Sequence, residues 1–279
     1  MLGMKRAILV GLALYAMAAL VLGGCSDSES PEATGTLNVS MVDAPLMESG
    51  VEAVNVTFSS IRVHRSDNAE AAADGWIDIV GPETAVENRT FNLFELVNGV
   101  SAVLGEQVLV AGTYTQIRII VESATLRVDG VDEELTIPSS AQTGIKLVGN
   151  FTVEPNVITE LMLDFDAEQS VRNLGNGEWE MRPTIRVVPV VMSGSISGVV
   201  LPTGSNAVVN VYAGGTTDLV TTTQIDAVNG EFMIQGLLAG TYDIEIVAEG
   251  FSLATVSGVV VTAGAETEAS NVTLVAIGS

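Results

Sequence analysis

The sequence predicts an all-β protein with two tandem antiparallel β-sandwich modules, at residues 35–190 and 195–279. Three observations support this prediction. Short segments alternate apolar with polar residues, and turn-forming residues separate these segments about every ten positions. The charge composition also changes abruptly after residue 186, which indicates a boundary between two modules.

Residues 1–24 have the organisation of a secretory signal peptide. Lys5 and Arg6 form a positive start, a run of apolar residues follows, and small residues precede Cys25. Residues 22–25 (LGGC) resemble the bacterial lipobox, which implies that Cys25 is lipidated and becomes the first residue of the mature chain. A transmembrane anchor and an ordinary secretory signal cut nearby are the alternatives, but the apolar run is short for a membrane span.

Residues 25–34 are polar and are predicted to form a flexible tether behind the lipidated cysteine. Ser26 stands where an aspartate tends to mark inner-membrane retention in enterobacterial lipoproteins, so this resemblance favours the outer membrane. Because Cys25 is the only cysteine, disulfide bonds are excluded. Because the lipid on Cys25 would insert into a membrane, the membrane is the expected partner of this end of the chain.

The chain carries 34 acidic and 11 basic residues, a formal net charge of −23. An acidic surface repels phosphate backbones, so nucleic acid is excluded as a partner. The negative net charge has two interpretations: it maintains solubility, or it binds divalent cations at the surface. The first is favoured, because acidic faces are usually only solvated.

In residues 35–190, alternating segments such as TLNVSMV, YTQIRIIVE and ELMLDFD predict half-buried strands. Residues 93–104 differ, because their apolar residues recur at helical spacing. This spacing predicts one or two short helical turns, interrupted by Gly99, that cover one end of the sandwich. The apolar stripe consists of Leu93, Leu96, Val97, Val100 and Leu104.

The second module begins near residue 195. No lysine or arginine follows Arg186, and residues 195–279 contain eight acidic residues. The run NGEFMIQGLLAGTYDIEI, with GF at 250–251, resembles the carboxypeptidase regulatory-like family, whose fold is a transthyretin-like Greek-key sandwich related in shape to carbohydrate-binding-like folds. The resemblance implies turn glycines at Gly230, Gly236 and Gly240, and core positions at Phe232, Leu237, Tyr242 and Phe251.

The first module resembles another family. Its segments GTLNVSMVDAP, FNLFELVNGVSAVLG, AQTGIKLVGNFTV and LMLDFDAEQSV are similar, in that order, to the bacterial domain-of-unknown-function family numbered 4382. That family occurs in secreted bacterial lipoproteins. The resemblance implies no activity, because none is established for the family.

One short motif occurs twice, as LVAGTYTQIRI from residue 109 and LLAGTYDIEI from residue 237. The flanking sequences do not align as a repeat, so we interpret the motif as a local solution for a turn that leads into a strand. Gly112 and Gly240 provide backbone freedom, while Tyr114 and Tyr242 pack inward and keep a hydroxyl for a polar partner.

Candidate catalytic groups are few. His64 is the only histidine, and it lies with Arg62 on the solvent face of an alternating strand, which favours an exposed edge residue over a catalytic one. The single cysteine is committed to lipid, which excludes cysteine–histidine catalysis and cysteine-based zinc sites. The sequence contains neither of the glycine-rich phosphate-binding motifs.

Asp164, Asp166 and Glu168 are the candidate metal ligands. If Leu161, Leu163 and Phe165 face inward, Asp164 and Asp166 share the outer face, about 6.6 Å apart at Cα, and can reach one Ca²⁺. A paired-carboxylate glycosidase site and a solvated strand end are the alternatives, of which the strand end is the commoner. No other cofactor is expected.

Trp76 and Trp179 are the candidate ligand-binding residues, because each follows a turn, where an exposed indole could stack on a sugar. Partial burial at a sheet edge is the alternative. The sequence thus predicts a cell-envelope lipoprotein that acts as a non-enzymatic binding or structural module, with a glycan or an envelope protein as partner. A carbohydrate-binding surface protein and a carboxylate-dependent hydrolase are the rival hypotheses.

Overall fold

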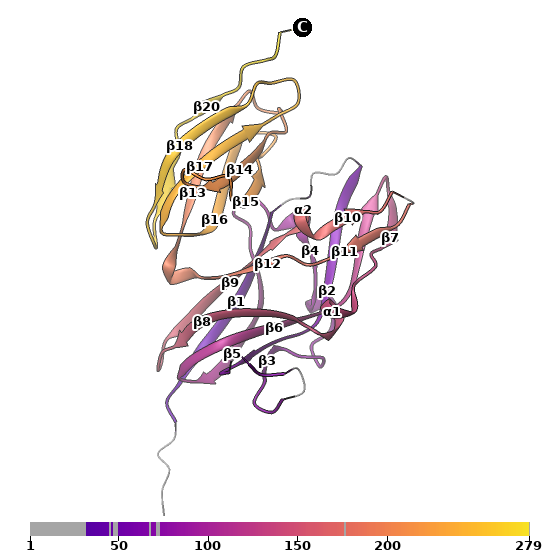
Figure 1. Cartoon of the computed structure of the whole chain (residues 1–279), viewed down its shortest axis with the longest axis vertical. Helices are drawn as coiled ribbons and strands as arrows, with labels where there is room; N and C mark the ends of the chain where they lie inside the picture. The colour runs from indigo at the N-terminus through magenta and orange to yellow at the C-terminus, as the bar shows by residue number, and fades with distance from the viewer. Residues whose placement is uncertain are drawn as a thin grey trace, which may run out of the picture. The chain divides into compact units, whose positions relative to one another are not determined.

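The computed structural model describes residues 32–44, 46, 50–66, 68–70, 73–175 and 177–278 (Figure 1). Cys25 and the signal-peptide prediction lie outside these residues. Residues 33–279 form one compact unit. None of the helices in the described part of the chain has the length and apolar character needed to span a bilayer.

The first part of this unit is built almost entirely from strands, as predicted. They are β1 (Thr34–Ala44), β2 (Val51–His64), β3 (Ile77–Val80), β4 (Thr90–Asn92), β5 (Ala102–Val110), β6 (Gly112–Val128), β7 (Val131–Glu134), β8 (Ile145–Val153), β9 (Ile158–Asp166), β10 (Val171–Asn173), β11 (Trp179–Met181) and β12 (Ile185–Pro189). Short helices interrupt them: α1 (Ser139–Thr143), α2 (Ala167–Ser170), and the 3-10 turns η1 (Val86–Asn88), η2 (Leu93–Glu95) and η3 (Val190–Met192).

These strands form two main sheets. One has the order β12-β9-β1-β5, and the other has the order β3-β2-β6-β7, with β4 on β2 and β8 on β6. β10 and β11 pair separately. Most neighbours are antiparallel, as predicted, and β1 and β9 run parallel along nine paired positions.

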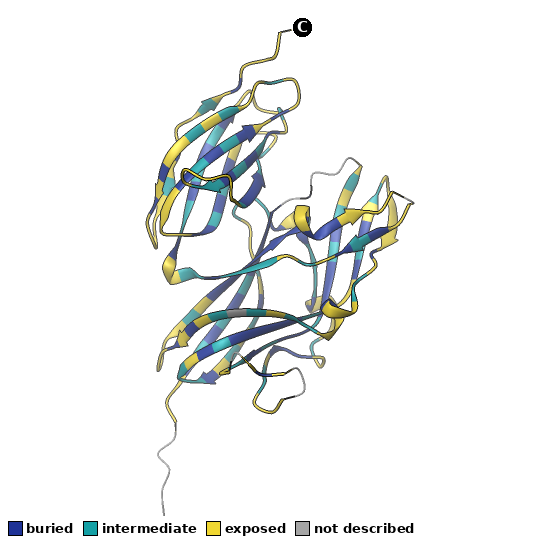
Figure 2. Cartoon of the chain, viewed as in Figure 1, coloured by how far each residue is buried: buried dark blue, intermediate teal, exposed yellow. Residues whose placement is uncertain are grey.

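The hydrophobic core of this part lies between the two main sheets. It takes every second residue of β1 (Leu37, Val39 and Met41) and of β9 (Leu161, Leu163 and Phe165), together with residues of β2 and β6 such as Phe58 and Ile119. The alternation of buried and more exposed positions is visible along the strands in Figure 2. Burial of these side chains, at about 1.5–3 kcal/mol each, drives the sheets together.

The last part of the unit contains β13 (Ser193–Leu201), β14 (Val208–Ala213), β15 (Leu219–Gln224), β16 (Glu231–Leu238), β17 (Gly240–Val247), β18 (Ala254–Val261), β19 (Glu266–Glu268) and β20 (Val272–Thr273). One sheet has the order β16-β13-β19, with β20 on β13, and the other has the order β15-β14-β17-β18. Their core is a hydrophobic cluster separate from the first, and all of its buried members lie between residues 196 and 274.

The core positions predicted for the second module are confirmed. Phe232, Leu237 and Tyr242 are buried, and Phe251 packs against them. Gly230 and Gly236 adopt positive φ angles of 76° and 70°, as turn glycines do.

The helical turn predicted near residue 93 is confirmed, but it ends earlier than the apolar stripe suggests. η2 covers Leu93–Glu95, and the Asn92 side chain accepts a hydrogen bond from the Phe94 backbone N–H at 3.2 Å. Asn98 and Gly99 then adopt positive φ angles of 55° and 83°, which terminate helical geometry. Leu104 therefore reaches the core from the extended strand β5, and Val100 is exposed.

The repeated motif makes the same tyrosine contact twice, although Gly112 adopts a φ angle of 139° and Gly240 does not adopt a positive φ angle. β6 begins at Gly112 and β17 at Gly240. The buried Tyr114 donates a hydrogen bond from its hydroxyl to the Val110 carbonyl at 3.0 Å, and Tyr242 donates to the Leu238 carbonyl at 2.7 Å. In both cases the acceptor lies four residues earlier in the chain, so the interpretation as a shared turn with a partnered hydroxyl is confirmed.

Candidate functional site

The structure corrects the geometry expected for Asp164, Asp166 and Glu168. The end of β9 is buried on both faces, because its inner face packs in the first core and Met162 on its outer face packs in a small cluster with Val42 and Val188. Asp164 and Asp166 are therefore buried, and only Glu168 is exposed. The two aspartates lie on the face of β9 away from the first core, as predicted, but that face is covered, so the prediction of a solvent-exposed carboxylate pair is wrong.

Both buried aspartates have structural partners. Asp164 Oδ2 lies 2.5 Å from Arg186 Nη2, which belongs to the paired position on β12. Asp166 is the N-cap of α2, where its side chain accepts a hydrogen bond from the Gln169 backbone N–H at 2.9 Å. Among the described residues, no group of three or more His, Cys, Asp or Glu side chains is arranged to hold a metal ion.

A third buried carboxyl, Asp43 at the end of β1, was not anticipated. Its Oδ1 accepts a hydrogen bond from the Ala167 backbone N–H at 3.1 Å, whereas its Oδ2 is buried with no hydrogen-bond partner in the described part of the chain. Burial raises the pKa of Asp43 well above its ordinary value, and the neighbouring charges of Asp164 and Asp166 raise it further. Burial also raises the pKa of Asp164, and the Arg186 charge opposes that rise.

Asp43 and Asp164 line a small cavity of ≈ 20 Å³ between β1, β9, β15 and β16. Thr222, whose buried hydroxyl also has no hydrogen-bond partner, lines the same cavity. Asn98, which also lines the cavity, joins the loop after η2 to β15 and β16. Its backbone N–H donates to Thr223 Oγ1 at 3.3 Å, and its side-chain oxygen accepts from the Met233 backbone N–H at 2.6 Å. The cavity is a polar packing site within the unit and has no room for an organic ligand.

Trp76 lies in a cluster with Arg62, Arg118 and His64. Its ring centroid is 5.6 Å from the Arg62 guanidinium carbon and 5.4 Å from that of Arg118, both within cation–π range. The indole N–H donates to the Glu70 carbonyl at 2.8 Å. The indole is half-buried, and the two arginine side chains lie over its ring.

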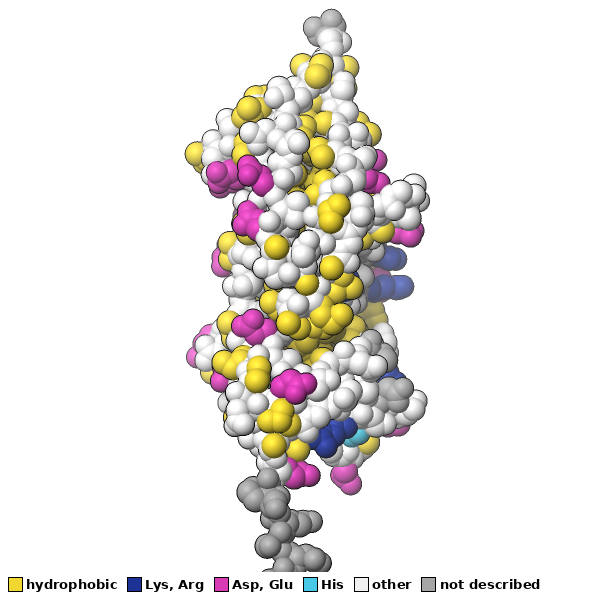
Figure 3. Space-filling view, turned by 90° about the vertical axis from the view of Figure 1, so that its left-hand side faces the viewer, with side chains coloured by type: hydrophobic (Ala, Val, Ile, Leu, Met, Phe, Trp, Pro, Cys, Tyr) yellow, Lys and Arg dark blue, Asp and Glu magenta, His cyan; other side chains and the backbone are white. Residues whose placement is uncertain are grey.

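His64 belongs to the same cluster and is half-buried, rather than exposed as predicted. It pairs with Gln116 of β6, β3 ends beside Val63, and the imidazole packs against Trp76 with ring centroids 5.1 Å apart. Its Nδ1 accepts from the Ser66 backbone N–H at 2.8 Å, so Nε2 carries the proton and donates to the Asp74 carbonyl at 3.0 Å. Figure 3 shows the histidine beside basic side chains, whereas acidic side chains are scattered over this face.

Trp179 is a core residue. Only 9% of it is exposed, and it packs in the first hydrophobic cluster together with Met181 from the same strand. The backbone at this position is also fixed, because the Trp179 carbonyl accepts a hydrogen bond from the Thr136 backbone N–H at 2.9 Å. The prediction that this indole could stack on a ligand is wrong.

A concave site that the sequence did not predict lies beside α1. Its volume is ≈ 510 Å³, and Lys146 from β8 and Arg182 from the segment after β11 line it together with apolar residues. The two cations are 36 residues apart in sequence (146 to 182), so no local motif joins them. The weak signal was that Lys146 is the only lysine after Lys5.

Comparisons with known proteins identify the first part of the chain. The family model for "Domain of unknown function (DUF4382)" matches residues 34–183. A search of curated proteins found no match.

Solved structures give only distant likenesses. A chain of a type II cohesin–X–dockerin complex from Acetivibrio cellulolyticus is 27% identical, over 30% of this chain and 58% of that chain, with a TM-score of 0.24. The chain thus spans less than two thirds of that protein. A minor pilin of Streptococcus agalactiae is 10% identical, over 87% of this chain and 98% of that chain, with a TM-score of 0.23. The shaft pilin of Lactobacillus rhamnosus GG is 8% identical, over 88% and 99%, with a TM-score of 0.21.

At these scores the solved structures carry no argument about function. The family match is different, because it covers more than half of the 279 residues. The chain belongs to the DUF4382 family.

Proposed function

We propose that the protein is a lipid-anchored component of the bacterial cell envelope, held in the outer membrane, that acts as a binding or structural module without enzymatic activity. The anchor is argued from the sequence: a signal peptide at 1–24, a lipobox-like LGGC ending at Cys25, and a polar tether at 25–34. Two or more acyl chains would hold such a protein on a membrane far more firmly than one chain does.

One observation carries the non-enzymatic part of this proposal: the side chains best suited to acid–base chemistry are engaged in holding the fold. Asp164 is paired with Arg186, and Asp166 caps α2. Both ring nitrogens of His64 are hydrogen-bonded to backbone groups. A general acid or base must be able to reach a substrate proton, which these contacts prevent.

The rival functions lose their support for related reasons. A carboxylate-dependent hydrolase needs two carboxyl groups on opposite sides of a substrate, whereas Asp164 and Asp166 are buried on a single strand. A sugar-stacking surface needs an open indole face, whereas Trp179 is in the core and the ring of Trp76 has two arginines beside it.

The anchor is tested by replacing Cys25 with alanine and following the protein through membrane fractionation. We expect the wild type in the outer-membrane fraction with an acylated N-terminal cysteine by mass spectrometry, and Cys25→Ala in the soluble or inner-membrane fractions. Ser26→Ala is the matched control, since it alters the neighbouring residue and keeps the thiol. A Cys25→Ala protein that remains in the outer membrane, or an unmodified mature N-terminus elsewhere, contradicts the proposal.

A further inference from the structure

The concave site beside α1 has the composition of a ligand groove. Pro138, Ala141, Ile145 and Pro183 provide apolar surface, and Lys146 and Arg182 provide the charged groups. Among the residues that the structure describes, no acidic side chain lines it. Its volume of ≈ 510 Å³ lies within the range of about 300–1,000 Å³ usual for small-molecule sites, which typically combine an apolar lining with a few polar groups. We call it the α1 groove.

The charge of the α1 groove is opposite to that of the protein. The chain has 34 acidic and 11 basic residues, yet both charged residues that line this groove are basic. Lys146 is exposed and forms no ion pair with any residue that the structure describes. An exposed ammonium without a fixed counter-charge remains available to an incoming anion.

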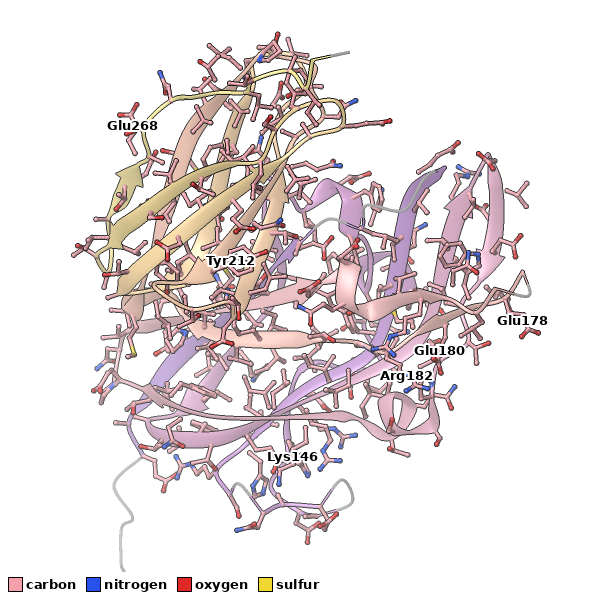
Figure 4. The ribbon with its side chains drawn as sticks, turned by 45° about the horizontal axis from the view of Figure 1, so that its top comes forward. Lys146, Glu178, Glu180, Arg182, Tyr212 and Glu268 are labelled. Atoms are coloured by element: carbon pink, nitrogen blue, oxygen red, sulfur yellow. The ribbon has the colours of Figure 1, made fainter. Side chains whose placement is uncertain are left out.

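Arg182 also keeps hydrogen-bonding capacity. Its Nε and Nη2 donate to the two carboxylate oxygens of Glu180 at 2.8 and 3.1 Å, and Figure 4 shows the two side chains next to each other. This contact orients the guanidinium, while the N–H groups on Nη1 are not used by it. The Arg182 side chain is 58% exposed, so the remaining donors can reach a ligand.

A row of basic residues leads to the groove. Arg62, Arg118 and Lys146 occupy paired positions on β2, β6 and β8, so their side chains lie side by side on the outer face of the sheet. Like charges on directly opposite positions destabilise a sheet, and the contacts of Arg62 and Arg118 with the Trp76 ring offset part of that cost, whereas Lys146 lies beyond Trp76 and has no such contact. The Arg118 stem packs beside the lining residue Gly144, whereas its guanidinium lies over the Trp76 ring.

We propose that the α1 groove binds a small organic anion with two acidic groups. One acidic group would meet the Lys146 ammonium and the other the Arg182 guanidinium, with the apolar body of the ligand against Ile145 and the two prolines. This inference rests on the proposed binding role and names its ligand class. Carboxylates and phosphates share the required chemistry, so the test includes one probe of each kind.

The experiment is a calorimetric titration of the full-length protein in detergent with glutarate, a dicarboxylate, and with pyrophosphate. Acetate is the reference with a single acidic group. We expect at least one dianion to bind about tenfold or more tightly than acetate, with affinity that falls as the salt concentration rises. Tighter binding of glutarate would identify carboxylate chemistry, and tighter binding of pyrophosphate would identify phosphate chemistry.

Variants locate the binding. Lys146→Gln and Arg182→Gln should each weaken the preferred dianion about tenfold or more, because each removes a charge-assisted contact. Arg127→Gln is the matched control: it removes the same charge from an exposed arginine that does not line the groove, and affinity should stay within about twofold.

Two results would overturn the inference. One is that neither dianion binds more tightly than acetate. The other is that Arg127→Gln weakens binding as much as Lys146→Gln does, which would indicate a general charge effect. Neither result affects the membrane fractionation of Cys25→Ala, so failure of the ligand class is distinguishable from failure of the proposed envelope role.

Discussion

Replacing Arg186 with glutamine removes the cation that pairs with the buried Asp164. Asp164 has only 6% of its side chain exposed and Arg186 has 32%. Breaking a fully buried ion pair by removing one partner costs about 3–5 kcal/mol, because the other charge remains buried without compensation. Since a third of the Arg186 side chain is in contact with solvent, we expect a smaller loss of about 2–3 kcal/mol in the free energy of unfolding at neutral pH.

The pH dependence of this loss identifies its cause. Burial raises the pKa of Asp164 and the Arg186 charge lowers it, so removing Arg186 raises the pKa of Asp164 further. A group whose pKa is higher in the folded state contributes stability at low pH that is lost as pH rises through that pKa. The destabilisation caused by Arg186→Gln should therefore be largest at neutral pH and shrink as the pH is lowered and Asp164 becomes protonated.

Denaturant unfolding followed by tryptophan fluorescence measures the effect, because Trp76 and Trp179 both belong to the part of the chain that contains this ion pair. The double variant Asp164→Asn/Arg186→Gln should recover much of the loss, since no buried charge remains. Arg127→Gln is the control, because its pair with Asp132 is exposed (47% and 61%) and should contribute about 0–1 kcal/mol. Equal losses for the Arg186 and Arg127 variants, or a loss independent of pH, would refute the reasoning.

Three further predictions use denaturant unfolding followed by circular dichroism, because residues 195–279 contain no tryptophan. Asp43→Asn should raise the free energy of unfolding at neutral pH by about 1–3 kcal/mol, because burial raises the pKa of Asp43 and the buried charged form is unfavourable. The stability that the protonated carboxyl contributes is lost as pH rises, and asparagine removes this loss. If the pH dependence of the free energy of unfolding is the same in the variant and the wild type, the prediction is wrong. Tyr114→Phe and Tyr242→Phe should each lower the free energy of unfolding by about 1 kcal/mol, because each removes one hydrogen bond. If neither variant changes the free energy of unfolding, the two hydroxyls do not stabilise the fold. Residues 195–279 expressed alone should unfold cooperatively, because their buried apolar residues form their own cluster, and a disordered NMR spectrum would count against this boundary.

Local pattern predicted most of the strands. Alternation with a period of two identifies a strand and the face that it buries, and this held for residues as distant as Leu37 and Phe232. The repeated turn motif was also interpretable from sequence, because the contact from each tyrosine hydroxyl to the carbonyl four residues earlier is local. Where a turn residue interrupts a helical pattern, as Asn98 and Gly99 do after η2, local spacing overestimated the helix.

The candidate site depended on contacts that no local pattern contains. By itself the sequence determined the all-β class, the positions of the cores and the lipobox-like end at Cys25, since each of these follows from residue types at short spacing. Alternation placed Asp164 on the outer face of β9 correctly, but only the tertiary structure decided that this face is covered and that Arg186 compensates the charge. In the same way, the packing of sheets and loops buried Trp179, surrounded Trp76 with arginines, and brought Lys146 and Arg182 into one groove. The physical reason is that a strand's periodicity specifies which side chains share a face, whereas the burial and charge of that face are set by distant segments that pack against it.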